Sequence, residues 1–176
     1  QGLPTAYREE NGKMRLKRPL TTGYRLPSEA EWAYAARFAG RQQAARFPWP
    51  GDTFPPVDVQ GNFGDTSARG VVPLVLEGYR DGYPATAPVG SFSANAAGLY
   101  DVGGNVAEWV QDYYAVYPAV VGKTARDPMG PDQGRHHVVR GSSWRDAGIS
   151  ELRLSYRDYS ERPRDDLGFR VARFAR

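Results

Sequence analysis

The clearest pattern of apolar and polar positions predicts a helix of about three turns that begins after Pro27. Ser28 is followed three residues later by Glu31, which is the spacing of a capping box. Trp32 and several alanines then supply an apolar face of good helix formers, and Gly40 marks the end of the helix. The small alanines predict close packing on a neighbouring surface. Trp32 is expected in the core rather than at a ligand.

Alternation of apolar and polar residues predicts strands in the last third of the chain. It is present at residues 136–140 and 152–157, and further strands are expected at 140–144 and 167–172. Short loops separate the last three of these strands, so we expect an antiparallel sheet. Residues 1–22 have no clear period and are interpreted as a lead-in loop with a short hairpin at Asn11-Gly12.

The middle of the chain is expected to be rich in turns. Seven prolines interrupt residues 41–90, which excludes long regular elements there: Pro48, Pro50, Pro55, Pro56, Pro73, Pro84 and Pro88. Two short segments in this region, Asn62-Phe63 and Asp81-Gly82-Tyr83, bring side-chain oxygens next to turns. Taken alone, both are ordinary turn signals.

The stretch from Gly98 to Trp109 combines a tight turn with two carboxylates. Gly103-Gly104-Asn105 permits unusual backbone angles that direct carbonyl oxygens inward, and Asp101 and Glu108 bracket this turn. Carboxylate and carbonyl oxygens at one point are what Ca²⁺ requires. The alternative is a glycine-rich turn whose carboxylates are solvated or cap nearby amides.

Composition limits the classes of function. The chain has 176 residues, 40% of them hydrophobic and 24% charged, which fits one globular domain. A net charge of +3 gives no case for nucleic-acid binding, and no apolar run approaches the length of a membrane span. There is no cysteine, so this chain supplies neither disulfides nor thiol chemistry. It begins with Gln1, which favours a fragment of a longer protein.

Other catalytic signals are weak. His136 and His137 are adjacent in a predicted strand, so they point to opposite faces and cannot chelate one metal together. Arg140 and Arg170 lie among aromatic residues, which favours packing or cation–π contacts over substrate binding. No nucleophile elbow, P-loop or dinucleotide-binding fingerprint is present.

Four separated segments, taken in order, closely resemble the formylglycine-generating enzyme family, also called the sulfatase-modifying factor domain. They are residues 23–32 (GYRLPSEAEW), 98–109 (GLYDVGGNVAEW), 140–144 (RGSSW) and 168–170 (GFR). The resemblance implies an α+β fold, a loop-rich variant of the C-type lectin fold with antiparallel sheet and few helices. It implies a single domain over residues 1–176 that lacks its N-terminal segment.

The resemblance also implies two structural calcium sites. The first set comprises the side chains of Asn62 and Asp81 with the carbonyls of Phe63 and Tyr83. The second set comprises the side chains of Asp101 and Glu108 with the carbonyls of Gly104 and Val106. Such ions would brace a loop-rich domain that has no disulfide.

The chain departs from the family where catalysis is expected. Enzymes that make formylglycine use two cysteines that bind copper, just after the segment that matches 140–144. Arg145 and Ser150 lie about where these thiols would be, and neither is a soft ligand for Cu(I). The resemblance therefore does not extend to cysteine-dependent formylglycine synthesis, and no residue of this chain is assigned a catalytic role.

Two functions remain open. In the first, the chain is a binding or structural module, a pseudoenzyme that presents loops 144–151 and 160–166 to a protein or a small molecule of unknown identity. The expected ligand surface comprises Trp144, Arg145, Asp146, Glu151, Tyr156 and Arg157. In the second, the chain is part of an ergothioneine-synthase-like iron enzyme or a pyoverdine-maturation oxidase, and an upstream domain supplies the redox centre. An extracytoplasmic location is favoured.

Overall fold

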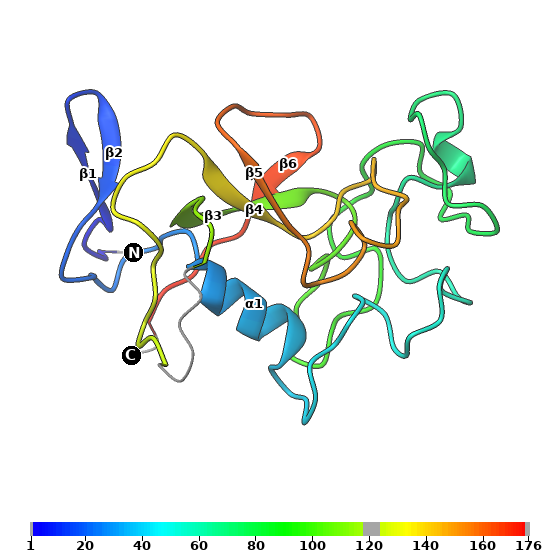
Figure 1. Cartoon of the computed structure of the whole chain (residues 1–176), viewed down its shortest axis with the longest axis horizontal. Coiled ribbons are helices and arrows are strands. Elements are labelled where there is room, and N and C mark those ends of the chain that lie inside the picture. Colours follow the sequence, from blue (N-terminus) through cyan, green and yellow to red (C-terminus); the bar gives the residue numbers. More distant parts are fainter. Residues whose placement is uncertain (1, 118–123, 175–176) are drawn as a thin grey trace.

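The computed structural model describes residues 2–117 and 124–174, and places a mixed sheet beside one helix (Figure 1). The sheet has the order β5-β4-β3-β6, and a separate hairpin pairs β1 with β2. The elements are β1 (Tyr7–Glu10), β2 (Lys13–Leu16), α1 (Glu29–Arg37), the 3-10 turn η1 (Thr66–Ala68), β3 (Ala107–Tyr113), β4 (His137–Arg140), β5 (Arg157–Ser160) and β6 (Leu167–Phe169). The hairpin lies at one end of the molecule, and the loops of residues 41–90 lie at the other.

The predicted hairpin is confirmed. Strands β1 and β2 are antiparallel, with Tyr7 opposite Leu16 and Glu10 opposite Lys13. Asn11 and Gly12 connect them with φ angles of 51° and 72°. Positive φ at both central residues characterises the turn that matches the twist of a two-residue hairpin.

The predicted helix and its capping box are also confirmed. The Ser28 hydroxyl accepts a hydrogen bond from the amide of Glu31 at 3.2 Å, and the Glu31 carboxylate accepts one from the amide of Ser28 at 2.8 Å. The helix ends at Arg37, with Phe38 as its C-cap, two residues before Gly40. Trp32 is 2% exposed and packs against a cluster that includes Val110. The helix therefore packs against the sheet, as its alanines and its tryptophan predict.

Two predicted strands are wrong. No strand spans residues 140–144. Strand β4 ends at Arg140, and Gly141, with a φ of 77°, turns the chain away from the sheet. The strand expected at 152–157 is a series of turns, and β5 begins only at Arg157. Leu152 and Leu154 alternate with polar residues because they enter two different core clusters, not because the backbone is extended.

The sheet is mixed rather than purely antiparallel. Strand β3, which the sequence did not predict, begins at Ala107 inside the glycine-rich stretch and continues to Tyr113. It pairs antiparallel with β4 and parallel with β6. Among the described residues, no helix has the length and apolar character that a bilayer-spanning segment needs.

A buried carboxylate joins the helix to this central strand. Asp112 of β3 is 4% exposed and accepts a hydrogen bond from the amide of Glu29 at 2.7 Å. The Glu29 carboxylate in turn accepts from Arg157 of β5 at 2.8 Å. Burial raises the pKa of Asp112 from 3.8 to about 6, and the neighbouring charge of Glu29 adds to this rise.

We expect Asp112 to make stability depend on pH in a defined direction. Between pH 3.8 and about 6 the folded chain retains a proton that the unfolded chain has lost, so the contribution of Asp112 to stability falls as the pH rises. Asp112→Asn cannot titrate and keeps an acceptor for the Glu29 amide. The free energy of unfolding of the natural chain, relative to this variant, should fall by about 1–2 kcal/mol between pH 4 and pH 7. Urea denaturation at both pH values measures it, and a constant difference would contradict the assignment.

Candidate functional site

The first predicted metal set is assembled by the loops at the end of the molecule far from the hairpin. The amide of Phe63 donates to Asp81 at 3.0 Å, and the side-chain nitrogen of Asn62 donates to the carbonyl of Ala85 at 2.6 Å. These bonds hold residues 62–63 beside residues 81–85. Asn62 is completely buried, and within the described residues its Oδ1 has no hydrogen-bond partner.

Other oxygens of this set also lack hydrogen-bond donors. In the part of the chain that the structure describes, the carbonyls of Phe63 and Tyr83 accept no hydrogen bond. The two carboxylate oxygens of Asp81 accept one each, from the amides of Phe63 and Tyr83. A buried acceptor without a donor is costly. The buried Asn62 oxygen therefore fits a cation better than a closed hydrogen-bond network, and the carbonyls of Phe63 and Tyr83 have no donor that would compete with such an ion.

The charge at Asp81 is poorly compensated by the protein. Burial raises the pKa of Asp81 from 3.8 to about 6, and the nearby carboxylate of Asp65 contributes to the rise. Asp65 is itself completely buried, accepts from the amide of Ser67 at 2.6 Å, and accepts from the amide of Asp81. Asp65 was not among the predicted residues; an acidic residue three positions after Asn62 was the local signal that could have indicated it.

The second predicted set has a different arrangement. Glu108 is 5% exposed, and its carboxylate accepts two hydrogen bonds from Arg170, at 2.6 and 2.5 Å. A third comes from the indole nitrogen of Trp32 at 2.7 Å. The charge of Glu108 is thus already neutralised by a bidentate guanidinium. A cation at this carboxylate would have to share it with Arg170, so this set stays a prediction.

The remaining members of the second set lie in the strained turn before β3. Asp101 and Asn105 have φ angles of 53° and 62°, and Gly104 has 85°. The Asp101 carboxylate accepts from the amide of Gly90 at 2.8 Å, and its carbonyl accepts from Arg170 at 3.2 Å. Val106 lies between this turn and β3. The turn therefore brings Asp101 and Glu108 to the same guanidinium.

Within residues 2–117 and 124–174, no three His, Cys, Asp or Glu side chains converge in a way that would hold a metal ion. A cation at either predicted set would therefore rely on amide and carbonyl oxygens in addition to carboxylates. That requirement excludes a zinc site of the usual kind and agrees with the oxygen preference of calcium.

The predicted ligand surface is only partly assembled. The placement of Trp144 on this surface is corrected, because its side chain is 4% exposed and packs in the core with Ala68 and Val72. Its ring instead supports the guanidinium of Arg145, whose central carbon lies 4.3 Å from the ring centroid. Arg157 is separate from this region, since it pairs with Glu29 and lies over the ring of Tyr114 at 4.4 Å.

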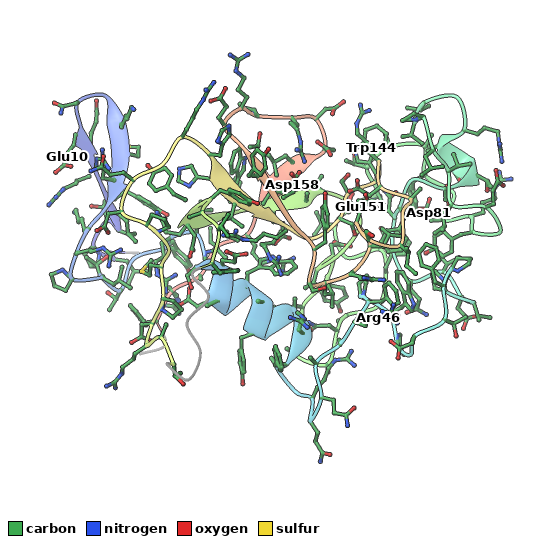
Figure 2. All side chains as sticks on the ribbon, in the orientation of Figure 1. Glu10, Arg46, Asp81, Trp144, Glu151 and Asp158 are labelled. Atoms are coloured by element: carbon green, nitrogen blue, oxygen red, sulfur yellow. The ribbon has the colours of Figure 1, made fainter. Side chains whose placement is uncertain are left out.

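Of the other four predicted residues, Asp146 and Glu151 lie near Tyr156, since their negative charges act on its hydroxyl. Figure 2 shows Glu151 among the loops on the side of the sheet away from the hairpin. Arg145 joins the loops through a bond to Asp165 at 2.5 Å. The Asp146 carboxylate accepts hydrogen bonds from the amide and the hydroxyl of Ser143. The Glu151 carboxylate lies against Gly148, where any side chain would collide with it. We name Arg145, Asp146, Glu151 and Tyr156 the loop face.

The loop face is acidic rather than arginine-rich. The three arginines of the two loops are already paired: Arg145 with Asp165, Arg162 with Glu161, and Arg164 with Asp158 and Asp166. Burial raises the pKa of Tyr156, and the negative charges of Asp158, Glu151 and Asp146 raise it further. Burial likewise raises the pKa of Asp146. A ligand group that carries positive charge would relieve this accumulation.

Comparison with known proteins gives one consistent family. The profile described as the sulfatase-modifying factor enzyme 1-like domain matches residues 4–175. The chain is 40% identical over 124 residues to a formylglycine-generating enzyme of Thermomonospora curvata, a match that covers 69% of this chain and 39% of that protein. It is 33% identical over 162 residues to the inactive C-alpha-formylglycine-generating enzyme 2 of Mus musculus, covering 85% and 43%.

Solved structures show the same fold. Treponema denticola variable protein 1 is similar with a TM-score of 0.68 and 30% identity, over 90% of this chain and 50% of that one. PvdO from Pseudomonas aeruginosa is similar with a TM-score of 0.64 and 32% identity, over 86% and 53%. The chain thus spans less than half of the two relatives above and about half of these structures.

The pairing of Glu108 gives a prediction that separates an ion-pair role from a calcium role. Glu108→Gln leaves the charge of Arg170 without its partner, so the free energy of unfolding should fall by about 2–3 kcal/mol in calcium and in EDTA alike. Urea denaturation in both buffers measures this. Glu77→Gln is a matched control, because Glu77 pairs with Arg69 on the surface, where both side chains are more than 60% exposed. A loss confined to calcium would instead identify Glu108 as a ligand.

Proposed function

Because the chain belongs to the family of sulfatase-modifying factor enzyme 1-like domains, we propose that it is a calcium-stabilised, cysteine-free member that acts as a binding or structural module. The observation that carries the calcium proposal is the unpartnered, buried Oδ1 of Asn62 near the half-buried carboxylate of Asp81. An ion there would bind the unpartnered oxygens of two turns, and it would hold together loops that no disulfide links.

Calcium fits the donor set better than other ions. The available donors are one amide oxygen, the Asp81 carboxylate and the carbonyls of Phe63 and Tyr83, which are all hard oxygens. Magnesium prefers a stricter octahedron and keeps more water, whereas calcium accepts irregular protein ligands. When bound, calcium would neutralise Asp81 and tie residues 62–63 to residues 81–83. We place the ion at this first set, and treat Asp101, Gly104, Val106 and Glu108 as a second set that depends on Arg170.

The module proposal rests on chemistry and on relatives. With no cysteine in the chain, a copper–thiolate centre has no ligands here. One similar mouse protein is named as inactive, and a similar solved structure is a variable protein of Treponema denticola. We propose the loop face as the contact surface, with a ligand or protein segment that presents a cationic group toward Asp146 and Glu151.

A second candidate is an oxidase of the same superfamily, favoured by the similarity to PvdO. In that case Tyr156 and the carboxylates of the loop face would bind substrate, and the redox centre would come from outside this chain. The two candidates differ in what must be present for function. The module needs calcium alone, whereas an oxidase needs a redox centre for turnover.

Metal analysis of the purified chain tests whether it holds calcium alone or a redox metal of its own. After dialysis against buffer with calcium, iron and copper at equal concentrations, we expect bound calcium near one ion per chain and no stoichiometric iron or copper. A peptide-oxidation assay on the same sample should show no turnover above a denatured control. Stoichiometric iron or copper together with turnover would overturn the module proposal.

Asp81→Asn tests the proposed ion. Calcium at 100 times its dissociation constant should stabilise the natural chain by about 2.7 kcal/mol relative to EDTA, and this gain should disappear in the variant. Thermal unfolding with and without calcium measures it. Asp58→Asn is the matched control, since Asp58 is an exposed carboxylate in the same loop region. An equal calcium effect in Asp81→Asn and in the natural chain would contradict the placement.

A further inference from the structure

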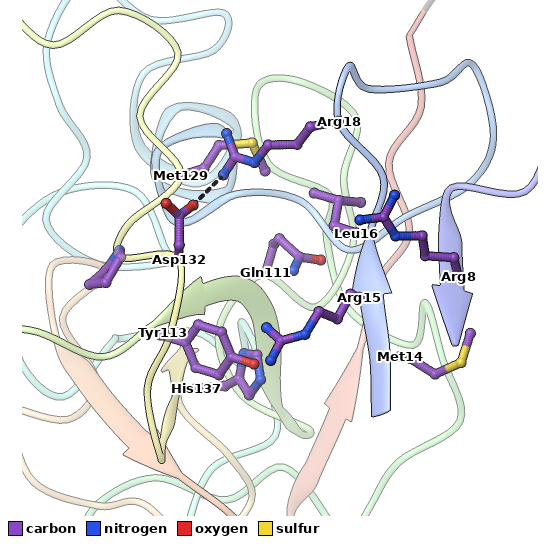
Figure 3. A pocket seen from close by; sticks show the side chains of 11 residues that line it. Arg8, Met14, Arg15, Leu16, Arg18, Gln111, Tyr113, Met129, Asp132 and His137 are labelled. Atoms are coloured by element: carbon purple, nitrogen blue, oxygen red, sulfur yellow. Dashed lines mark ion pairs between the residues drawn. The ribbon is translucent and has the colours of Figure 1, made fainter. Parts of the chain in front are cut away.

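A cavity of about 250 Å³ lies between the hairpin and the sheet, at the end of the molecule away from the calcium set. Arg8 and Arg15 reach it from β1 and β2, and Arg18 from the segment after β2. Tyr113 of β3 and His137 of β4 form the facing wall (Figure 3). The cavity shares no residue with the loop face or with either predicted metal set.

Positive charge is concentrated around this cavity. Residues 8–18 contain five basic and two acidic side chains, an excess of three that equals the net charge of the whole chain. Arg8 and Arg15 are directly opposite each other in the hairpin register. Like charges in that position repel each other, so the hairpin holds two guanidinium groups together at a cost that a bound anion would offset.

The nearby carboxylates do not neutralise these arginines fully. Glu10 serves both Arg8, at 2.7 Å, and Arg15, at 3.5 Å. Oδ1 of Asp132 is 3.4 Å from a guanidinium nitrogen of Arg18, but the Asp132 side chain is 86% exposed, so water screens this ion pair. Two carboxylates therefore face three guanidinium groups. Lys13 adds a fourth cation in an adjoining hollow that Arg15 and Tyr113 also line.

The facing wall offers aromatic surface rather than further charge. The rings of Tyr113 and His137 are 4.2 Å apart, with an angle of 32° between their planes. Burial lowers the pKa of His137, so its imidazole is neutral near pH 7. Gln111 lies between the two walls (Figure 3). Its Oε1 accepts a hydrogen bond from the hydroxyl of Tyr7 at 2.7 Å, so this oxygen already has a donor.

We propose that this cavity binds a small organic anion through a phosphate or carboxylate group. The anionic group lies between Arg15 and Arg18, with Arg8 as a further cation, because guanidinium groups form paired hydrogen bonds with both oxyanions. The organic part lies on the rings of Tyr113 and His137. The volume fits a compound the size of a substituted benzene or a short diacid, not a nucleotide or a peptide chain.

The test uses the whole chain and three probes: phenyl phosphate, benzoate and inorganic phosphate, at constant ionic strength. Two-dimensional NMR with each probe should show saturable binding with a dissociation constant below about 10 mM. The ring resonances of His137 and Tyr113 should shift with phenyl phosphate or benzoate. The tighter of these two probes identifies the oxyanion, and inorganic phosphate should bind more weakly than phenyl phosphate.

Three variants locate the site. Arg15→Gln and Arg18→Gln should each weaken binding about tenfold, because each removes one charged partner of the anion. Arg18 lies outside both strands, so its replacement does not depend on hairpin stability. Arg69→Gln, at a surface arginine paired with Glu77, should leave binding unchanged. Absence of saturable binding by any probe, or equal weakening in all three variants, would overturn the proposal.

Discussion

The bidentate bond between Arg170 and Glu108 holds the centre of this fold together. Glu108 lies on the central strand, and Trp32 of the helix donates to the same carboxylate. Arg170 also donates to the carbonyls of Tyr100 and Asp101, so one guanidinium fixes the glycine-rich turn, the central strand and the C-terminal segment. A buried charge pair of this kind adds little net stability over an apolar pair, but removing one partner is costly. It therefore specifies which segments meet.

The loop-rich half of the molecule follows a different principle. Its core is aromatic: Phe47 stacks on Trp49 with ring centroids 4.6 Å apart, and Phe63 meets Trp49 edge to face at 5.6 Å. Large rings bury much area while the backbone remains irregular. The polar groups of such a backbone still need partners, and the turns of Asn62 and Asp81 leave several acceptors without donors. That imbalance is the physical reason to place a cation in this half.

Local chemistry determined which parts of the fold were predictable. The capping box at Ser28 and the Asn11-Gly12 turn each specify their own geometry within four residues, and both were predicted correctly. Strand β3 was hidden because a glycine-rich turn leads directly into it. Leu152 and Leu154 were wrongly predicted to lie in a strand. They are buried at alternate positions of a turn because each packs in a different core cluster, and a half-buried strand gives the same sequence pattern.

Long-range partners were beyond the reach of the sequence. The residues of both metal sets were chosen by resemblance, but nothing local revealed that Arg170, 62 positions away, would pair with Glu108. The same holds for Trp144, whose place in the core depends on the loops of residues 68–85. The arginines of the hairpin were recorded only as part of a lead-in loop. Their convergence with Tyr113 and His137 depends on how the hairpin docks on the sheet.

The parallel pairing of β6 with β3 determines when this domain can finish folding during its synthesis on the ribosome. Gly168 lies opposite Glu108, and Ala172 exchanges two backbone hydrogen bonds with Arg25, so residues 167–172 contact both the first third and the middle of the chain. None of these contacts forms while that segment is inside the exit tunnel. Until then the Glu108 carboxylate has no guanidinium partner, and the central strand has an open edge. Folding of this domain is therefore completed only after residues 167–172 have left the exit tunnel.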